Sequence, residues 1–180
     1  LHLCHHNLET IETTSTTSDT LLAEVCYAAK EEGASITRYH GKHQGTNHGT
    51  ASQLCTVLAR SFADIGDIVR GRDIFRGNPE EKKKRDELDD KLKTIFGKIK
   101  GNNNSTPTGL PLHKVREYWW YANRHTVWKA ITCHVVSGTY FRPTCGDSGS
   151  PSQAQNQCRC DDNPNTDPPT YFDYVPQYLR

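Results

Sequence analysis

Seven cysteines and nine histidines are the residues of this 180-residue chain most suited to chemistry, as nucleophiles, redox pairs or metal ligands. The cysteines stand at long, irregular intervals without a CxxC pair, a spacing that fits neither a zinc ribbon nor a thioredoxin-like redox site. Cys4, His5 and His6 are adjacent, but no nearby residue completes a tetrahedral ligand set. We therefore expect no metal and no cofactor, and disulfides formed in an oxidising compartment.

No group of residues predicts catalysis. The stretch "CGDSGS" at 145–150 is similar to the sequence around a serine-protease nucleophile, but that fold is all-β whereas this chain has helical periodicity. Cysteine–histidine catalysis would need a free thiolate, which an oxidised chain rarely keeps. We expect a protein that is not an enzyme, with a disulfide-rich secreted enzyme as the alternative from another class.

Basic residues concentrate in one part of the chain, where residues 68–85 carry seven basic groups against three acidic ones. Lysine and arginine in such an array match the oxygens of sulfate or phosphate groups. Acidic residues at 86–90 interleave with the array, so a solvated helix face is the competing interpretation. The candidate glycan- or receptor-binding residues are Arg70, Arg72, Arg76, Lys82, Lys83, Lys84, Arg85, Lys91, Lys93, Lys98 and Lys100.

Composition limits the remaining classes of function. The formal net charge is +1, so no global field draws the chain toward nucleic acid or an anionic membrane, and any electrostatic binding must be local. The sequence has no apolar run near the length of about 18 residues that a membrane span needs, and no signal peptide opens it. With 34% hydrophobic residues, the chain is long enough for one domain with a core.

The apolar residues of the chain recur mostly at intervals of three and four, which predicts that helices position the cysteines and the basic residues. We expect helices from Ser18 or Asp19 to Gly33, over 52–69, from a cap at Asn78 to residue 100, and over 112–133, with loops at 34–50 and 101–111. Gly66, inside the second helix, indicates close helix packing. Three tryptophans at helical spacing in the fourth helix predict core residues rather than a ligand-stacking surface.

Four stretches together resemble one family: "SQLCTVLARSFADIGDIVRG" at 52–71, "EYWWYANRHTVWKAITC" at 117–133, "QCRC" at 157–160 and "PPTYFDYVPQYLR" at 168–180. They are similar to a Duffy-binding-like domain, and more narrowly to its alpha class in the erythrocyte membrane protein family of Plasmodium falciparum. The resemblance covers essentially the whole chain. It implies an all-α, disulfide-pinned helical bundle with long irregular loops. The chain would then be a piece truncated at both ends, with the end of a first subdomain at 1–50, a helical second subdomain at 51–140 and the start of a third at 141–180.

The resemblance implies adhesion. A domain of this family would bind host receptors from the outer face of the infected erythrocyte, mediating cytoadherence or rosetting, and would be anchored in the membrane only through other parts of its parent protein. The implied partners are erythrocyte or endothelial receptors, among them heparan-sulfate-like glycans, complement receptor one and blood-group A sugars, and antibodies. The alternative is a non-binding antigenic scaffold that presents variable loops.

The resemblance also implies a disulfide between Cys55 and Cys133, because matching cysteines are bridged in related domains. Cys4 would pair with a cysteine upstream of residue 1. Of Cys145, Cys158 and Cys160, two would pair with each other and the third would reach beyond Arg180. Cys26 is left without an assigned partner.

Overall fold

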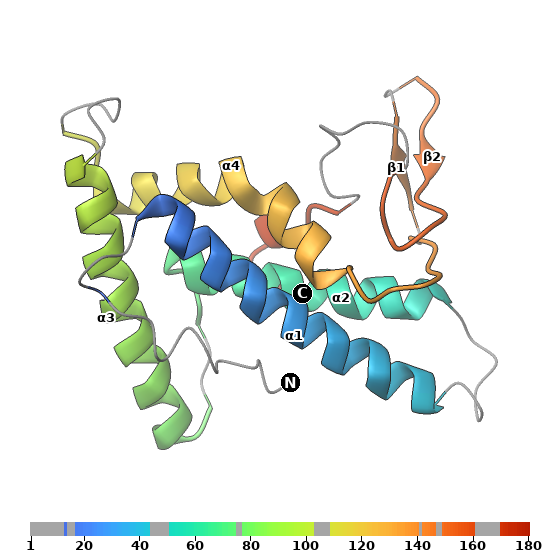
Figure 1. The fold of residues 1–180 in the computed structure, drawn as a ribbon, viewed down its shortest axis with the longest axis horizontal. Coiled ribbons are helices and arrows are strands. Elements are labelled where there is room, and N and C mark those ends of the chain that lie inside the picture. The colour runs from blue at the N-terminus through green and yellow to red at the C-terminus, as the bar shows by residue number, and fades with distance from the viewer. Residues whose placement is uncertain are drawn as a thin grey trace.

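The computed structural model describes residues 13, 17–43, 51–74, 77–102, 109–140, 142–146, 149–160 and 170–180. Its elements are α1 (Ser18–His43), α2 (Ala51–Arg70), α3 (Pro79–Asn102), α4 (Leu112–Ile131), β1 (Pro143–Cys145), β2 (Ser152–Gln153) and two 3-10 turns, η1 (Phe172–Tyr174) and η2 (Gln177–Leu179). The two strands pair antiparallel. The predicted helical, disulfide-held fold is confirmed (Figure 1).

Helices α1, α2 and α4 pack side by side, and α3 crosses their ends at one side of the molecule (Figure 1). Each helix contributes an apolar stripe to one continuous core, because its buried residues recur at intervals of three and four. The largest fully buried side chains in this core include Leu21, Val25, Leu58, Phe62, Ile65, Leu92, Ile95, Phe96, Trp120 and Ile131.

The three tryptophans of α4 lie in this core, which confirms their predicted structural role. Trp120 and Trp128 both contact Phe62 of α2, with ring centroids 5.2 Å apart in each pair. Trp119 packs edge-on against Phe96 of α3 at 5.7 Å. The indole of Trp119 also donates to Ser18 of α1 at 3.0 Å. All three tryptophans are 6% exposed or less, so together they join α4 to the other three helices.

Gly33 does not end α1, contrary to the sequence prediction. The helix continues through residues 34–43, which were predicted to be a loop, and the rest of that predicted loop, 44–50, lies outside the described residues. A Cβ atom on Gly33 would lie 1.9 Å from the carbonyl oxygen of Ile131, so glycine lets α1 cross the backbone of α4. Gly66 has the packing role predicted for it, because a Cβ there would lie 2.8 Å from the ring of Trp120.

The start of α3 follows the predicted capping pattern. The side-chain oxygen of Asn78 accepts a hydrogen bond from the backbone N–H of Glu81 at 2.9 Å, and Pro79 occupies the first helical position. The apolar stripe of Leu88 and Leu92 then turns toward the core. The lysines of the first turns are thereby left on the solvent side.

Cys55 pairs with Cys158, so the predicted pairing of Cys55 with Cys133 is wrong. The Cα atoms of the bridged residues lie 5.5 Å apart, in the usual range for a disulfide. Gly138 accounts for the close approach of the two segments: a Cβ there would lie 2.9 Å from each sulfur, so the absence of a side chain lets the turn lie on the disulfide. Cys133 follows the end of α4 and is an exposed thiol.

Cys145 pairs with Cys160, which is an internal pair of the kind predicted for this region. The expectation that the third cysteine of the group would reach beyond residue 180 is wrong, because Cys158 is bound to α2. Cys26 is a half-buried thiol, and burial raises its pKa to about 11. Cys4 lies outside the described residues.

Candidate ligand-binding surface

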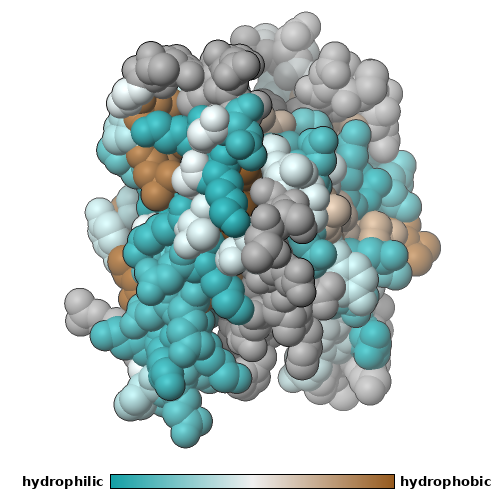
Figure 2. All heavy atoms as spheres, turned by 60° about the vertical axis from the view of Figure 1, so that its left-hand side comes forward, coloured by the Kyte–Doolittle hydropathy of each residue, from teal (hydrophilic) through white to brown (hydrophobic). Residues whose placement is uncertain are grey.

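Helix α3 carries most of the candidate basic residues on its solvent side. Lys82, Lys83 and Lys84 follow its first turn and are exposed, because the apolar stripe of this helix faces the other way. The face of the molecule over α3 is hydrophilic (Figure 2). We call the exposed run of Lys82, Lys83 and Lys84 the α3 basic surface.

Acidic residues neutralise part of α3. Lys83 lies 3.9 Å from Glu87, one helical turn away. Lys93 contacts Asp89 at 2.8 Å and Asp90 at 3.1 Å, and its hydrogen bond to Asp89 raises the pKa of its ammonium group. Pairs of this kind on an exposed helix contribute little to stability, but they reduce the charge that α3 presents to a ligand.

The arginines before and within α3 are also bound to carboxylates. Arg85 is half-buried and paired with Asp73, and Arg72 forms an ion pair with Glu117, with its Nε 2.6 Å from a carboxylate oxygen. The Lys98 ammonium donates to the backbone oxygen of Thr13. Of the other candidates, Lys91 and Lys100 are half-exposed, and Arg76 lies outside the described residues.

A hollow of about 370 Å³ separates the end of α2 from the first turns of α3. Ile68 and Leu88 line it with apolar surface, while Lys82 and Asp86 bring opposite charges to it. The hollow therefore offers a ligand an apolar contact beside both a cation and an anion. Its full lining is Ile68, Gly71, Asp73, Ile74, Lys82, Arg85, Asp86, Leu88 and Asp89.

Arg70 is not part of this exposed surface, contrary to the sequence prediction. Its side chain is 1% exposed. Its Nε donates to the carbonyl oxygen of Gly66 at 3.0 Å, and its Nη2 donates to Asp67 at 2.9 Å and to the carbonyl oxygen of Asp173. The guanidinium therefore holds the C-terminal segment 170–180 against α2.

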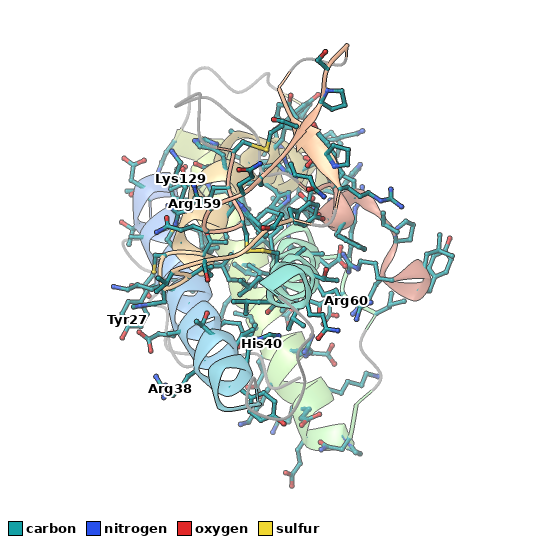
Figure 3. The ribbon with its side chains drawn as sticks, turned by 90° about the vertical axis from the view of Figure 1, so that its right-hand side faces the viewer. Tyr27, Arg38, His40, Arg60, Lys129 and Arg159 are labelled. Carbon is teal, nitrogen blue, oxygen red and sulfur yellow. A yellow bond between two sulfur atoms is a disulfide. The ribbon has the colours of Figure 1, made fainter. Side chains whose placement is uncertain are left out.

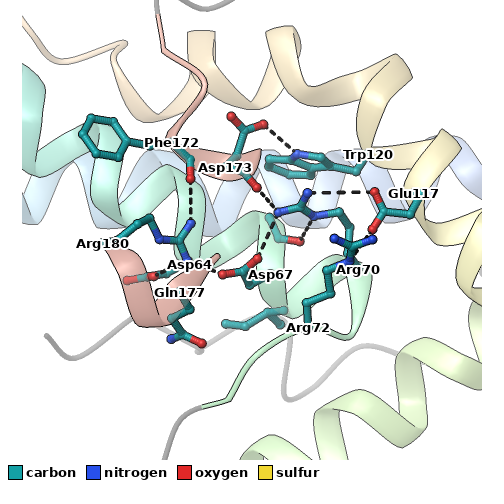
Figure 4. Close-up of polar contacts among 12 residues, drawn as sticks. Asp64, Asp67, Arg70, Arg72, Glu117, Trp120, Phe172, Asp173, Gln177 and Arg180 are labelled. Atoms are coloured by element: carbon teal, nitrogen blue, oxygen red, sulfur yellow. Dashed lines mark hydrogen bonds and ion pairs between the residues drawn. The ribbon is translucent and has the colours of Figure 1, made fainter. Parts of the chain in front are cut away.

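Asp173 is the centre of a buried ionic cluster, shown in part in Figure 4. Its carboxylate accepts hydrogen bonds from Arg124 Nε at 2.7 Å, from Arg124 Nη2 at 2.8 Å and from Trp120 Nε1 at 3.0 Å. Arg124 also donates to the carbonyl oxygen of Thr170 at 2.8 Å. The sequence does not predict this cluster, because Arg124 and Trp120 lie 49 and 53 residues before Asp173 and no local pattern joins them to it.

Arg180 closes the same segment onto α2 by binding Asp67 and by lying 3.3 Å from Asp64 (Figure 4). Burial raises the pKa of both carboxyl groups, and the charge of Arg180 acts in the opposite direction. The segment carries exposed Tyr171 and Tyr178 on its outer side. The charged side chains of Asp173 and Arg180 thus fix this segment to α4 and α2.

The described residues contain no cluster of three or more histidine, cysteine or acidic side chains that could hold a metal ion. Within the same part of the chain, no helix has both the length and the apolar character needed to cross a membrane.

These features define a class of protein: a helical domain, held by disulfides, with a charged outer surface. The family model for the Duffy binding domain matches residues 1–180, and the chain therefore belongs to the Duffy binding domain family. A comparison with curated protein sequences found no match.

Solved structures of Plasmodium falciparum membrane protein 1 (PfEMP1) are similar to the whole chain. The NTS-DBL1(alpha-1) domain from the varO strain is 36% identical, with a TM-score of 0.77. The matched region covers 99% of this chain and 40% of that one. The ICAM-1-binding IT4var13 DBLbeta domain is 31% identical, with a TM-score of 0.68 and coverage of 99% and 39%. The same DBLbeta domain bound to ICAM-1 is 30% identical, with a TM-score of 0.64 and coverage of 99% and 40%. The chain thus spans about two fifths of these structures.

Proposed function

We propose that this chain is part of a host-receptor adhesion module of a parasite variant surface antigen, displayed on the outer face of infected erythrocytes. Membership of the Duffy binding domain family supports this proposal, as does a homologous DBLbeta domain whose structure is bound to ICAM-1. The module would act in cytoadherence or rosetting. Its candidate ligands are heparan-sulfate-like glycans, complement receptor one and blood-group A sugars.

The α3 basic surface is the observation that carries the glycan part of the proposal. Lys82, Lys83 and Lys84 are consecutive exposed cations that only Glu87 approaches within ion-pair distance among the described residues. Ammonium groups in this arrangement can form charge-assisted hydrogen bonds with sulfate groups. Arg85 lines the adjoining hollow, but its ion pair with Asp73 gives it a structural role as well.

Heparin-affinity chromatography of the complete domain tests the α3 basic surface. Salt elutes the protein by screening exposed charge contacts, over a Debye length of about 10 Å at 0.1 M salt. Changing Lys82, Lys83 and Lys84 together to Ser removes such contacts, so less salt should be needed to elute the protein. Changing Lys30, Arg38 and Arg60 to Ser is the matched control, since all three are exposed and the change in net charge is the same.

Equal loss of retention in both triple variants would show that net charge, and not this surface, governs heparin binding. The antigenic-scaffold alternative is tested by the unmodified domain. The adhesion proposal is contradicted if the domain does not bind red cells, heparin or purified receptor ectodomains. Recognition of that same domain by antibodies would then support the scaffold.

A further inference from the structure

Helix α4 has a solvent-facing stripe that none of its core contacts uses. Tyr118 and Tyr121 are 61% and 68% exposed, and Lys114 and Lys129 are exposed as well. With half-exposed His125 they are spaced four, three, four and four residues apart, which places all five on one side of a helix. The α4 ridge, as we call these five residues, is about 22 Å long at 1.5 Å per residue.

Within the described part of the chain, the position of α4 leaves this ridge facing solvent. Helix α4 runs along the edge of the helical body, with α1 and α2 packed on its inner side (Figure 1). The buried side chains of α4 point to that inner side, and Trp119, Trp120 and Trp128 anchor it there. Exposed aromatic side chains on a rigidly anchored helix lose little further freedom on binding, which favours affinity.

The α4 ridge carries positive charge without any acidic residue. The one acidic residue of α4 is Glu117, and its carboxylate is bound to Arg72. Among the described residues, neither Lys114 nor Lys129 forms an ion pair. At the end of the ridge, Arg159 donates to the carbonyl oxygen of Lys129 at 2.6 Å, which brings another cation beside it (Figure 3).

This charge pattern differs from that of α3. On α3, Lys83 and Lys93 both have acidic partners within 4.0 Å on the same helix. On α4, the inward-facing arginines have acidic partners, as in the pair of Arg124 with Asp173, whereas the outward-facing Lys114 and Lys129 have no ion-pair partner among the described residues. Both lysines therefore present their charge to solvent, although the α3 sequence is richer in basic residues.

We propose that the α4 ridge is a docking surface for an acidic protein segment. Tyrosine is among the residues most enriched at the energetic centres of protein interfaces. The two tyrosines form the centre of the ridge, and the lysines flank it on both ends. Carboxylates on the partner would face those lysines. This surface is separate from the α3 basic surface and does not depend on the glycan proposal.

A fluorescein-labelled peptide of twenty glutamates serves as the probe, with its binding to the complete domain followed by fluorescence anisotropy at low salt. We expect Lys114→Ser with Lys129→Ser to weaken binding at least fivefold. Tyr118→Ala with Tyr121→Ala should weaken it by a similar factor, although this pair of changes leaves the net charge unaltered. Lys30→Ser with Arg38→Ser on α1 is the control for charge, because both residues are exposed and lie outside both proposed surfaces, and it should change binding less than twofold.

Each contrary outcome overturns the proposal. These are an absence of poly-glutamate binding, equal weakening by the α1 control, and weakening by the lysine changes without weakening by the tyrosine changes, which would indicate attraction by charge alone. Heparin binding that depends on the ridge while poly-glutamate binding does not would make the ridge a glycan site instead. The four substituted residues are exposed, so a melting temperature unchanged within 2 °C or so checks that the variants are folded.

Discussion

Removing the carboxylate of Asp173 should destabilise the protein more than most single changes. The carboxylate is buried and accepts three hydrogen bonds, two from Arg124 and one from Trp120. In Asp173→Ala, the guanidinium of Arg124 would keep its hydrogen bond to Thr170, but it would be a buried charge without this counter-charge. That loss costs about 3–5 kcal/mol, and the unpaired indole N–H of Trp120 adds about 1 kcal/mol.

The expected total of about 4–6 kcal/mol approaches the whole free energy of unfolding of a marginally stable domain. A double variant separates the ionic term from the rest. In Asp173→Ala with Arg124→Met, no unpaired guanidinium remains, so the double variant should be at least 2 kcal/mol more stable than Asp173→Ala alone, on the order found for other buried pairs.

Urea unfolding followed by far-UV circular dichroism measures the global loss. Tryptophan fluorescence in a background with Trp119→Phe and Trp128→Phe measures the environment of Trp120. A fluorescence transition at lower urea than the dichroism transition would show that segment 170–180 detaches first. The reasoning is refuted if Asp173→Ala loses less than about 1 kcal/mol and the double variant shows no coupling.

Two further predictions concern the helix crossing and the disulfides. Gly33→Ala should lower the free energy of unfolding in urea by about 1–3 kcal/mol, because its Cβ would meet the backbone of α4. The control Gly97→Ala, whose Cβ would meet nothing within 4 Å, should raise it by about 0.5–1 kcal/mol. Destabilisation by both changes would contradict the packing role of Gly33. Replacing Cys55 and Cys158 by serine should cost about 4–5 kcal/mol, against about 3 kcal/mol for the second disulfide, because the sequence separations are 103 and 15 residues. Non-reducing peptide mapping that joined Cys55 to any other cysteine would disprove the pairing.

The sequence predicts the elements whose signals are local. Asn78 and Pro79 mark the start of α3 within one turn, and the spacing of the tryptophans is enough to place them in the core. Gly33 was misread because a helix stop and a close helix crossing both call for glycine. Only the position of α4 in space distinguishes the two.

The errors at the candidate site come from contacts between distant residues. Arg70 looks like a surface cation until segment 170–180 closes over it, and the hydrogen bond to Asp173 spans 103 residues. Cysteine spacing does not specify connectivity, so the pairing with Cys133 rested on the resemblance alone. The exposure of Lys82 to Lys84 could be predicted, because the Leu88 and Leu92 stripe fixes which side of α3 faces solvent.

The disulfide between Cys55 and Cys158 has a mechanical consequence for the proposed adhesion module. When the chain is pulled from positions on either side of residues 55–158, tension passes through the sulfur–sulfur bond and bypasses the 102 residues between the two cysteines. These residues would add about 340–370 Å of length if they were extended. Most of α2, all of α3 and α4, and β1 and β2 therefore lie outside the covalent path of the load, which reaches them only through the noncovalent contacts of α1 and of segment 170–180. Reducing both disulfides would release that length in a single-molecule pulling experiment, because the bond between Cys145 and Cys160 would otherwise keep residues 146–159 out of the loaded path.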